Sequence, residues 1–486
     1  MKKRSVTENV FFNMLYQVLV TVLPILTTPY TARTLGLHSN GIHSFTESIV
    51  TYFIIFGAIG TSLYGIRKIA YVRDDEEKLA KVTKEIISLR LILMLATLAI
   101  YIPALCIKNE YAYIYRIHII NIVANGLDIT WFYQGVEDFK KVTLRNLFVK
   151  LLFVVSLFTF IKSPDDLPLY VLFIVSSALI GNLIMIYYLP QYVDLRKGKN
   201  IKAFTHLKSS LGLFVPQAMN YIYVLIDRSM LGWMTNTDNV GLYDQAQRLV
   251  RMITGVLQSV GYVMMARVAN LTMANEQEGI KNYVRKSVNF NLFIAFPAMF
   301  GIMGVADDFI PFFLGSEYLD SIPLLKLMSV LIFLSSMNSL MGVQLLIPLG
   351  REKFYTAATT SGAFISVIGN LLLIPFLGPV GSCIACIVAE STVFAVSYWN
   401  LRDMFEFKVI LKDNFPIMIG SFVMFLAVKL VALIEVNVII KLICELGVGV
   451  AIYGAVALIT KNQTCLLILE KVFGFIKRFT AKGKGE

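Results

Sequence analysis

The sequence predicts an all-α, polytopic membrane protein of about 14 transmembrane helices. Hydrophobic residues make up 57% of the 486 residues and charged residues only 16%, which is not the composition of a protein with a water-exposed surface. The hydrophobic residues also fall into runs of about 20 residues, the length that crosses a bilayer. Lipid offers backbone groups no hydrogen-bonding partner, so runs of this kind form helices.

Fourteen runs are long and apolar enough to be spans. They lie at 9–32, 44–66, 87–107, 112–134, 147–162, 167–192, 209–231, 241–266, 287–306, 322–350, 354–376, 380–401, 414–434 and 437–460. The fifth, thirteenth and fourteenth contain or adjoin Lys150, Lys429, Lys441 and Glu445, so a count of twelve is the alternative. Either number places both termini on the same side of the membrane.

Lys and Arg residues fall mainly in every second connection, starting with the N-terminus. Cytoplasmic connections carry this excess, so we expect a multi-pass protein of the plasma (inner) membrane with both termini in the cytoplasm. The net charge of +12 then fixes orientation and does not indicate nucleic acid. The first run is too long for a signal-peptide core and is expected to stay as a helix. The basic segment 461–486 predicts an amphipathic helix on anionic lipid.

An internal repeat relates the first two spans to the seventh and eighth. Residues 33–36 resemble 228–232, and residues 41–67 resemble 241–267 at a constant offset of 200. The match predicts a duplicated six-helix unit with parallel orientation, as in some secondary transporters; chance similarity between apolar helices is the alternative. We therefore expect a six-helix lobe at 1–200, a second at 201–405, and two additional helices with the basic tail at 406–486.

Several spans carry polar residues on one face. They are Asn13 and Gln17 in the first span, His118, Asn121, Asn125 and Asp128 in the fourth, Gln217, Asn220, Asp227 and Arg228 in the seventh, and Asp244, Arg248 and Arg251 in the eighth. An intramembrane charge costs about 2.5 kcal/mol or more, so such faces point away from lipid and usually mark a substrate or ion path. Interhelical hydrogen bonds that only hold the bundle together are the alternative.

The arginines indicate an anionic substrate. Arg248 and Arg251 lie one turn apart with only Asp244 near them in sequence. A guanidinium is always ionised and binds phosphate through paired hydrogen bonds. Together with Arg33 and Arg228, these two residues could hold a diphosphate.

Membrane-embedded carboxylates are candidates for binding a coupling ion. Asp128, Glu47 and Glu390 could bind H⁺ or Na⁺, or could be neutralised by protonation or a hydrogen bond. No cofactor and no metal site is expected. Cys383 and Cys386 form a C-x-x-C, but within an apolar run, where thiols behave as small hydrophobic side chains.

Four segments resemble the polysaccharide-transporter family, which includes the flippases of O-antigen and capsule repeat units. They are 128–140 (DITWFYQGVEDFK), 64–67 (YGIR), 214–243 and 344–352 (QLLIPLGRE). The resemblance implies membership of the multidrug, oligosaccharidyl-lipid and polysaccharide exporter superfamily, with two six-helix lobes and a cleft between them. It implies flipping of an undecaprenyl-diphosphate-linked oligosaccharide across the plasma membrane by alternating access, for surface polysaccharide such as exopolysaccharide, capsule or O-antigen. For the basic tail, docking of polysaccharide assembly enzymes is the second expectation, after binding to anionic lipid.

Three other functions compete with this one. A peptidoglycan-precursor flippase would carry the same lipid diphosphate, and only the motif match disfavours it. A multidrug antiporter would need carboxylates and aromatics for a cationic drug, against the arginines present. A membrane glycan polymerase or ligase would need an acid and base pair on a sizeable external loop. The pairs Asp165–Asp166 and Asp307–Asp308 are expected to be solvated loop charges, so we do not expect an enzyme.

Overall fold

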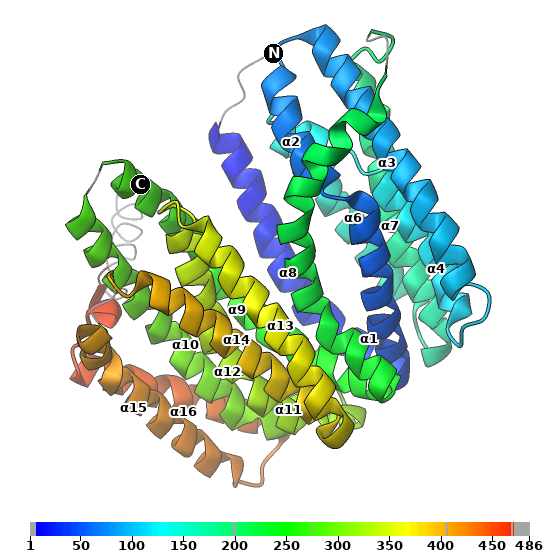
Figure 1. Cartoon of the computed structure of the whole chain (residues 1–486). Coiled ribbons are helices and arrows are strands. Elements are labelled where there is room, and N and C mark those ends of the chain that lie inside the picture. Colours follow the sequence, from blue (N-terminus) through cyan, green and yellow to red (C-terminus); the bar gives the residue numbers. More distant parts are fainter. Residues whose placement is uncertain (1–5, 198–200, 275, 405–406, 468–469, 471–486) are drawn as a thin grey trace, which may run out of the picture. The chain divides into compact units, whose positions relative to one another are not determined.

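The structure is a computed structural model that describes residues 6–197, 201–274, 276–404, 407–467 and 470. Within these ranges it leaves out the side chains of 6–22, 215–217, 220, 259–267, 407, 408 and 411. The regular elements of the described residues are all helices (Figure 1). In the described part of the chain, ten helical segments are long and apolar enough to cross a membrane. The predicted all-α polytopic class is therefore confirmed.

Sixteen helices account for the predicted spans in the part of the chain that is described. They are α1 Val6–Ala58, α2 Thr61–Val72, α3 Glu76–Leu105, α4 Ala112–Gly126, α5 Thr130–Gly135, α6 Phe139–Phe160, α7 Leu167–Tyr188, α8 Leu207–Met234, α9 Thr237–Met273, α10 Gln277–Phe313, α11 Ser321–Met328, α12 Val330–Ser339, α13 Glu352–Leu377, α14 Pro379–Leu401, α15 Phe407–Ala432 and α16 Val438–Ile459. A π-helical turn at Leu340–Leu346 continues α12. Each of the fourteen predicted spans overlaps at least one helix. The predicted amphipathic tail falls mostly outside the described residues.

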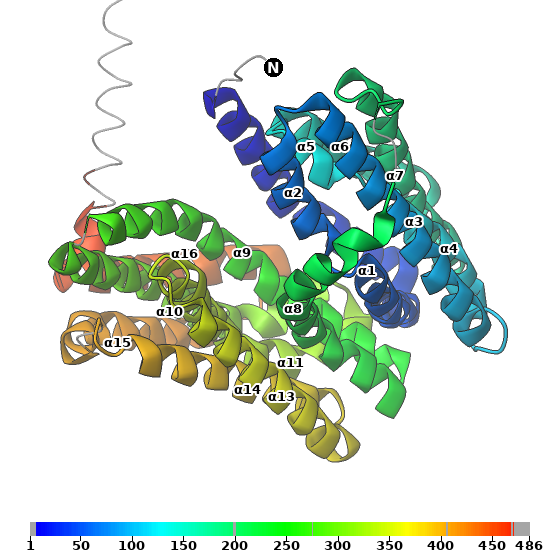
Figure 2. The ribbon, with the colours of Figure 1, turned by 45° about the horizontal axis from the view of Figure 1, so that its top comes forward.

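The chain divides into two units, Met1–Asp244 and Gln245–Glu486. In the first unit α1, α3, α4, α6 and α7 pack side by side (Figures 1 and 2). Apolar side chains at the centre of this packing, such as Leu35, Ile114 and Leu157, are almost fully buried. The first unit therefore has its own hydrophobic core.

The first two predicted spans lie on the two helical segments of α1, which meet at a kink at Gly36. Gly36 has φ 74° and ψ 178°, outside the helical region and open mainly to glycine. The Asn40 side chain spans the bend, donating to the carbonyl oxygens of Thr31 (2.9 Å) and Gly36 (2.7 Å). The second span was expected to reach residue 66, but the helix ends at Ala58. Gly60, with φ 68°, then turns the chain into the separate helix α2.

The fourth predicted span, 112–134, is two helices rather than one. Helix α4 ends at Gly126, and the Asp128 carboxylate accepts the backbone N–H of Thr130 (2.9 Å) at the start of α5. An Asp side chain often accepts the backbone N–H two residues further on, which favours a turn over a continued helix. Asp128 therefore does not share a helix face with His118, as the uninterrupted span had implied.

Positions that correspond in the predicted repeat meet inside the first unit. Gly41 and Gly241 face each other so closely that a Cβ on Gly41 would lie 2.0 Å from the Thr237 carbonyl oxygen. On either side of the glycines, His38 binds Asp238 (2.7 Å) and Ser44 binds Asp244 (2.8 Å). Residues that match at an offset of 200 contact one another only near an axis that relates the repeats. Both glycines are required because the helices cross at backbone distance.

In the second unit α15 and α16 run together along α10, and α13 and α14 form an antiparallel pair (Figure 1). Charged side chains join α15 to α10 at both ends. Arg285 binds Asp413 (2.7 Å) near the start of α10. Near its end Asp307 binds Lys429 of α15, and Asp308 binds Lys441 of α16 (3.0 Å). These pairs explain how the thirteenth and fourteenth spans accommodate their lysines.

The expectation that Asp307 and Asp308 are solvated loop charges is wrong. Both lie within α10, and Asp307 also binds Lys326 of α11 (2.6 Å). We call the five residues Asp307, Asp308, Lys326, Lys429 and Lys441 the ionic cluster. Glu445 of α16, which is fully buried, interacts electrostatically with Asp308 and Lys441 of this cluster.

Candidate functional site

Two segments that carry the family resemblance pack against each other in the first unit. A Cβ on Gly65 of α2 would lie 2.6 Å from the Trp131 ring, and one on Gly135 of α5 would lie 2.7 Å from the Ile69 side chain. Trp131 is 1% exposed. The glycines let α2 and α5 approach this closely because they have no side chain. The YGIR and WFYQG stretches are therefore parts of one packed structure.

Arg90 of α3 is a buried guanidinium beside α2 that the sequence analysis did not identify. Its Nη1 donates to Ser62 Oγ (2.8 Å) and Thr61 Oγ1 (3.3 Å), and its Nη2 donates to the carbonyl oxygen of Asn125. No carboxylate of the described residues forms an ion pair with it. The available signal was its place inside the predicted span 87–107, where an arginine indicates a buried partner.

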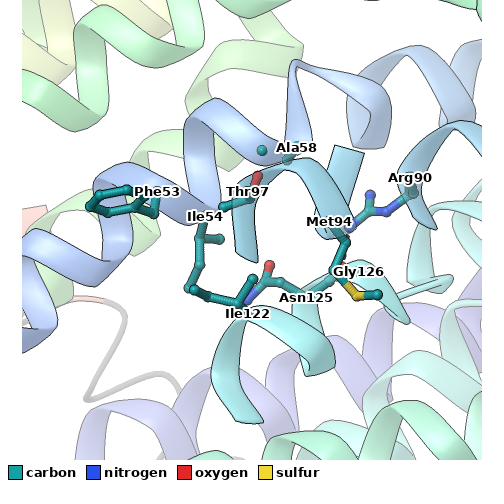
Figure 3. A pocket seen from close by; sticks show the side chains of 10 residues that line it. Phe53, Ile54, Ala58, Arg90, Met94, Thr97, Ile122, Asn125 and Gly126 are labelled. Carbon is teal, nitrogen blue, oxygen red and sulfur yellow. Dashed lines mark hydrogen bonds between the residues drawn. The ribbon is translucent and has the colours of Figure 1, made fainter. Parts of the chain in front are cut away.

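A small cavity lies beside Arg90 (Figure 3). Its volume is about 20 Å³, and Thr97 and Asn125 line it from α3 and α4. This is enough for about one water molecule with polar partners. Asn125, a predicted substrate-binding residue, thus faces this cavity, whose volume is too small for a sugar.

His118 lies buried between α4 and α1. It is 2% exposed, and neither ring nitrogen has a hydrogen-bond partner among the described atoms. His43 and Glu47 of α1 are its ionisable neighbours, with His43 Nε2 3.8 Å from Glu47 Oε2. The structure therefore brings together His118 and Glu47, which the sequence had treated as a substrate residue and an ion-coupling candidate on separate spans.

Arg228 is engaged in an ion pair. It lies 2.7 Å from Asp244 Oδ1, and Ser44 Oγ donates to Asp244 Oδ2 (2.8 Å). Arg228 and Asp244 are 8% and 1% exposed. A buried pair of this kind is held by the mutual attraction of the charges and by the added hydrogen bond. Arg228 therefore joins α8 to the start of α9.

Arg248 and Arg251 lie on α9 in the second unit. Arg251 is exposed and donates to Gln247 Oε1 (2.6 Å), an uncharged acceptor, and Arg248 is half-buried. The carboxylate closest to them in sequence, Asp244, is bound by Arg228 and Ser44. In the first unit, Arg33 is exposed three residues before the bend at Gly36.

The remaining predicted residues have separate surroundings. Asp128 begins α5, as described above. Glu390 of α14 accepts a hydrogen bond from the Asn338 side chain, which also donates to the Glu390 carbonyl oxygen (3.0 Å). The side chains of Asn13, Gln17, Gln217 and Asn220 lie outside the described part of the chain.

An apolar cavity of about 300 Å³ lies within the second unit. It is bordered by α10, α12, α14 and α15, through side chains such as Phe296, Phe333, Met337 and Phe394. Methionine and phenylalanine give such a cavity an adaptable hydrophobic wall. Its lining suits hydrocarbon rather than sugar.

Among the residues that the structure describes, no group of three His, Cys, Asp or Glu side chains could hold a metal ion. Cys383 and Cys386 are buried thiols in α14.

The chain is similar along most of its length to known transporters. It is 22% identical over 409 residues to a protein of Escherichia coli (strain K12) named "Putative O-antigen transporter", which covers 82% of this chain and 98% of that one. It is 24% identical to a Shigella dysenteriae protein of the same name, over 76% of this chain and 93% of that one.

Solved structures of transporters have the same fold. A lipid II flippase MurJ in an inward closed conformation matches with a TM-score of 0.74 at 15% identity, covering 93% of this chain and 98% of that one. An inward-facing multidrug resistance MATE family transporter of the MOP superfamily matches with a TM-score of 0.58 at 16% identity, covering 80% and 99%.

A family model described as "polysaccharide biosynthesis protein" matches residues 6–265, more than half of the chain. The matched range contains the packed α2 and α5 segments, Arg90 and both copies of the repeated helix pair. Together with the named relatives and the shared fold, this match shows that the chain belongs to the polysaccharide biosynthesis protein family and is a polysaccharide transporter of the MOP superfamily.

Proposed function

We propose that the protein flips undecaprenyl-diphosphate-linked oligosaccharide repeat units from the cytoplasmic to the outer leaflet of the plasma membrane, for surface polysaccharide synthesis. The relatives named as O-antigen transporters support a substrate of this class. Such a substrate has a polar sugar that cannot cross hydrocarbon, a diphosphate that needs positive charge, and a lipid chain that stays in the bilayer. The protein supplies binding and movement, and no covalent step is needed.

The observation that carries this proposal is the pair of arginines on α9. Arg248 and Arg251 lie one helical turn apart, and they follow Asp244, which binds Arg228 and Ser44. Arg251 is exposed and donates to the Gln247 side chain (2.6 Å). An exposed guanidinium can reach an anionic ligand, and phosphate accepts its paired hydrogen bonds. We assign the diphosphate to Arg251 and Arg248, and Arg33 stays a separate substrate-binding candidate.

The apolar cavity of the second unit supports the proposal that the substrate carries a lipid chain. Its lining is almost entirely hydrocarbon and aromatic, and its volume is about 300 Å³. A prenyl segment that enters the cavity leaves the packed but mobile acyl chains of the bilayer. It gains free energy only through close contact with the cavity wall, which methionine side chains can provide. The sugar would have to be held elsewhere, by polar groups.

Transport is proposed to follow alternating access, in which the two lobes rock so that the cleft faces first the cytoplasm and then the exterior. The positive-inside distribution supports cytoplasmic termini. Uphill transport would need a coupled ion, H⁺ or Na⁺. Glu47 is the strongest of the three carboxylate candidates, because it lies near the buried His43 and His118, whereas Asp128 begins α5 and Glu390 accepts from Asn338.

The test is reconstitution into liposomes with a fluorescently labelled, diphosphate-linked oligosaccharide. Wild-type protein should accelerate exchange of the label between leaflets over empty vesicles. Equal rates with and without protein would reject the proposal.

The arginine assignment is tested in the same assay. Arg248→Ala with Arg251→Ala should lower the flipping rate at least about tenfold, because two charge-assisted contacts to the diphosphate are lost. The matched control is Arg402→Ala, which removes a cation that stacks on the Trp399 ring at the end of α14 (4.4 Å). Wild-type flipping by a correctly inserted double variant would show that the α9 arginines are structural.

A further inference from the structure

A second cavity opens between α2 and the first half of α8, inside the first unit. Its volume is about 320 Å³, and its lining includes Tyr64, Arg67, Lys68, Tyr71, Ser209 and Gly212. In liquid water, about ten molecules occupy this volume. A Cβ added to Gly212 would meet no neighbouring atom within 4 Å, so the glycine leaves the cavity open on the α8 side. We call this cavity the basic pocket.

Both cations of the basic pocket lack a carboxylate partner among the described residues. Arg67 Nε reaches only the hydroxyl of Tyr71 (3.4 Å), and its guanidinium lies over the Tyr71 ring (5.7 Å). The next cations along the chain are different, because Arg73 binds Glu137 (2.7 Å) and Lys78 binds Asp75 (2.8 Å). Positive charge in the pocket therefore remains available to an external anion.

A buried hydrogen-bonded chain holds the two walls of the pocket together. The Tyr64 hydroxyl and His206 Nδ1 are 2.7 Å apart, and His206 Nε2 lies 2.8 Å from Glu85 Oε2. His206 and Glu85 are each 5% exposed, and Glu85 also accepts the backbone N–H of Lys202 (3.0 Å). Helices α2 and α3 are thus tied to the segment that leads into α8. A site whose walls are fixed in this way loses little entropy when it binds a ligand.

The surroundings of the pocket resemble a membrane interface. Tyr71 is 72% exposed and Phe204 is 61% exposed, and the exposed leucines Leu63 and Leu211 lie on α2 and α8. Exposed aromatic side chains next to apolar ones are typical of the headgroup level of a bilayer. Basic pockets between membrane helices at this level bind the headgroups of anionic lipids.

We propose that the basic pocket binds the phosphate group of a membrane lipid. Arg67 and Lys68 would neutralise the phosphate, and the Tyr71 and Ser209 hydroxyls would donate to its oxygens. The lipid diphosphate of the proposed substrate and a bulk anionic phospholipid share this chemistry, and both would keep their hydrocarbon in the bilayer. The inference does not depend on transport.

The experiment measures lipid binding by native mass spectrometry of the full-length, detergent-solubilised protein. The background carries Arg248→Ala and Arg251→Ala, so that the other proposed diphosphate site is removed. The pocket variant adds Arg67→Gln and Lys68→Gln. The matched control adds Arg73→Gln and Lys78→Gln, which removes the same charge from the same end of the first unit but from cations that already have partners. Four probes are compared: undecaprenyl diphosphate, phosphatidylglycerol, undecaprenol and inorganic pyrophosphate.

The pocket variant should bind the lipid phosphates about tenfold more weakly than the background, and the matched control should change by less than about twofold. Undecaprenol should bind all three proteins equally. Preference for undecaprenyl diphosphate would identify the substrate lipid as the occupant, whereas equal binding of phosphatidylglycerol would identify bulk lipid.

Three results would overturn the inference. They are unchanged affinity of the pocket variant, an equal loss in the matched control, and pyrophosphate binding as tight as that of the lipid phosphates, which would indicate a free anion. Exchanging the cations as Arg67→Lys with Lys68→Arg should retain binding, which separates loss of charge from misfolding. Failure of the liposome flipping assay would reject the transport proposal and leave this measurement unaffected.

Discussion

The ionic cluster of the second unit and the basic pocket of the first unit use the same residue types in opposite ways. In the ionic cluster Lys326, Lys429 and Lys441 each bind Asp307 or Asp308. In the basic pocket Arg67 and Lys68 bind no carboxylate of the described chain. Lysines of α11, α15 and α16 that pair with the aspartates of α10 hold these four helices together, whereas cations left without a carboxylate can attract an external anion. The presence of Lys and Arg therefore says less about their role than the position of the carboxylates does.

The largest change in stability is expected when a cation is removed from the ionic cluster. Lys441→Met leaves Asp308 beside the buried Glu445 without the lysine that binds Asp308. Two neighbouring carboxyl groups cannot both stay ionised where little water reaches them. We expect the free energy of unfolding to fall by about 3 kcal/mol, the usual cost of breaking a largely buried pair.

The measurement is thermal or denaturant unfolding in detergent. Adding Asp308→Asn to Lys441→Met should restore most of the loss, because a neutral pair needs no counter-charge. The flipping rate and the affinity for lipid should change only as far as the loss of stability lowers the amount of folded protein. A double variant no more stable than Lys441→Met would contradict the idea that pairing is what the cluster provides.

Arg90 tests the comparison further, since it is buried, unlike the partly exposed ionic cluster, and bonds to uncharged acceptors. Arg90→Met would leave the hydroxyls of Thr61 and Ser62 and the carbonyl oxygen of Asn125 without their donor. Each lost bond to a charged donor is worth about 1.5–3 kcal/mol, but hydroxyls can find other partners. We expect a net loss of about 2 kcal/mol.

The loss should appear as a lower unfolding temperature, and hydrogen exchange should report local loosening of α2 against α3 and α4. Arg116→Met is a suitable control, because Arg116 donates to one carbonyl oxygen, that of Cys106 (3.0 Å), at the other end of α4. An equal loss in both variants would show that the Arg90 contacts are not specially important.

The smallest effect is expected at a solvent-exposed ion pair. Arg351 donates to Asp403 (3.0 Å), and this contact lowers the pKa of Asp403, which lies beyond the end of α14. A lowered pKa means that the pair stabilises the fold above the ordinary pKa of the carboxyl and that this contribution is lost as pH falls through the folded-state value. Because both side chains are partly exposed, the contribution should be below about 1 kcal/mol.

Unfolding curves of wild type and Asp403→Asn, measured from neutral pH down to about pH 3, test this expectation. The two proteins should differ at neutral pH and converge as the pH falls. A difference that grows with acidification would have the wrong sign.

Several features of the fold followed from the sequence alone. Runs of apolar residues must be helical in lipid, so the spans and the all-α class were predicted, and the matching stretches near Gly41 and Gly241 indicated a repeat. Helix ends were predicted less well. The breaks at Gly60 and at Asp128 depend on a single positive φ and on one side-chain hydrogen bond, which hydropathy does not register.

The candidate site was predicted only in part. The arginines of α9 were identified because charge in an apolar span is unusual, and the structure shows that Asp244 is committed to Arg228. Arg90 was overlooked, although it is also a charge in a predicted span. The basic pocket could not be predicted, because Arg67 and Ser209 are far apart in sequence and meet only through the packing of α2 on α8.

The sequence by itself determined that this protein spans a membrane as a helical bundle, because this property follows from the solvation of local stretches of chain. Tertiary structure alone decided which charges are paired. Coulomb attraction and desolvation act between residues such as Asp308 and Lys441, which are more than a hundred positions apart and become neighbours only when α16 packs along α10.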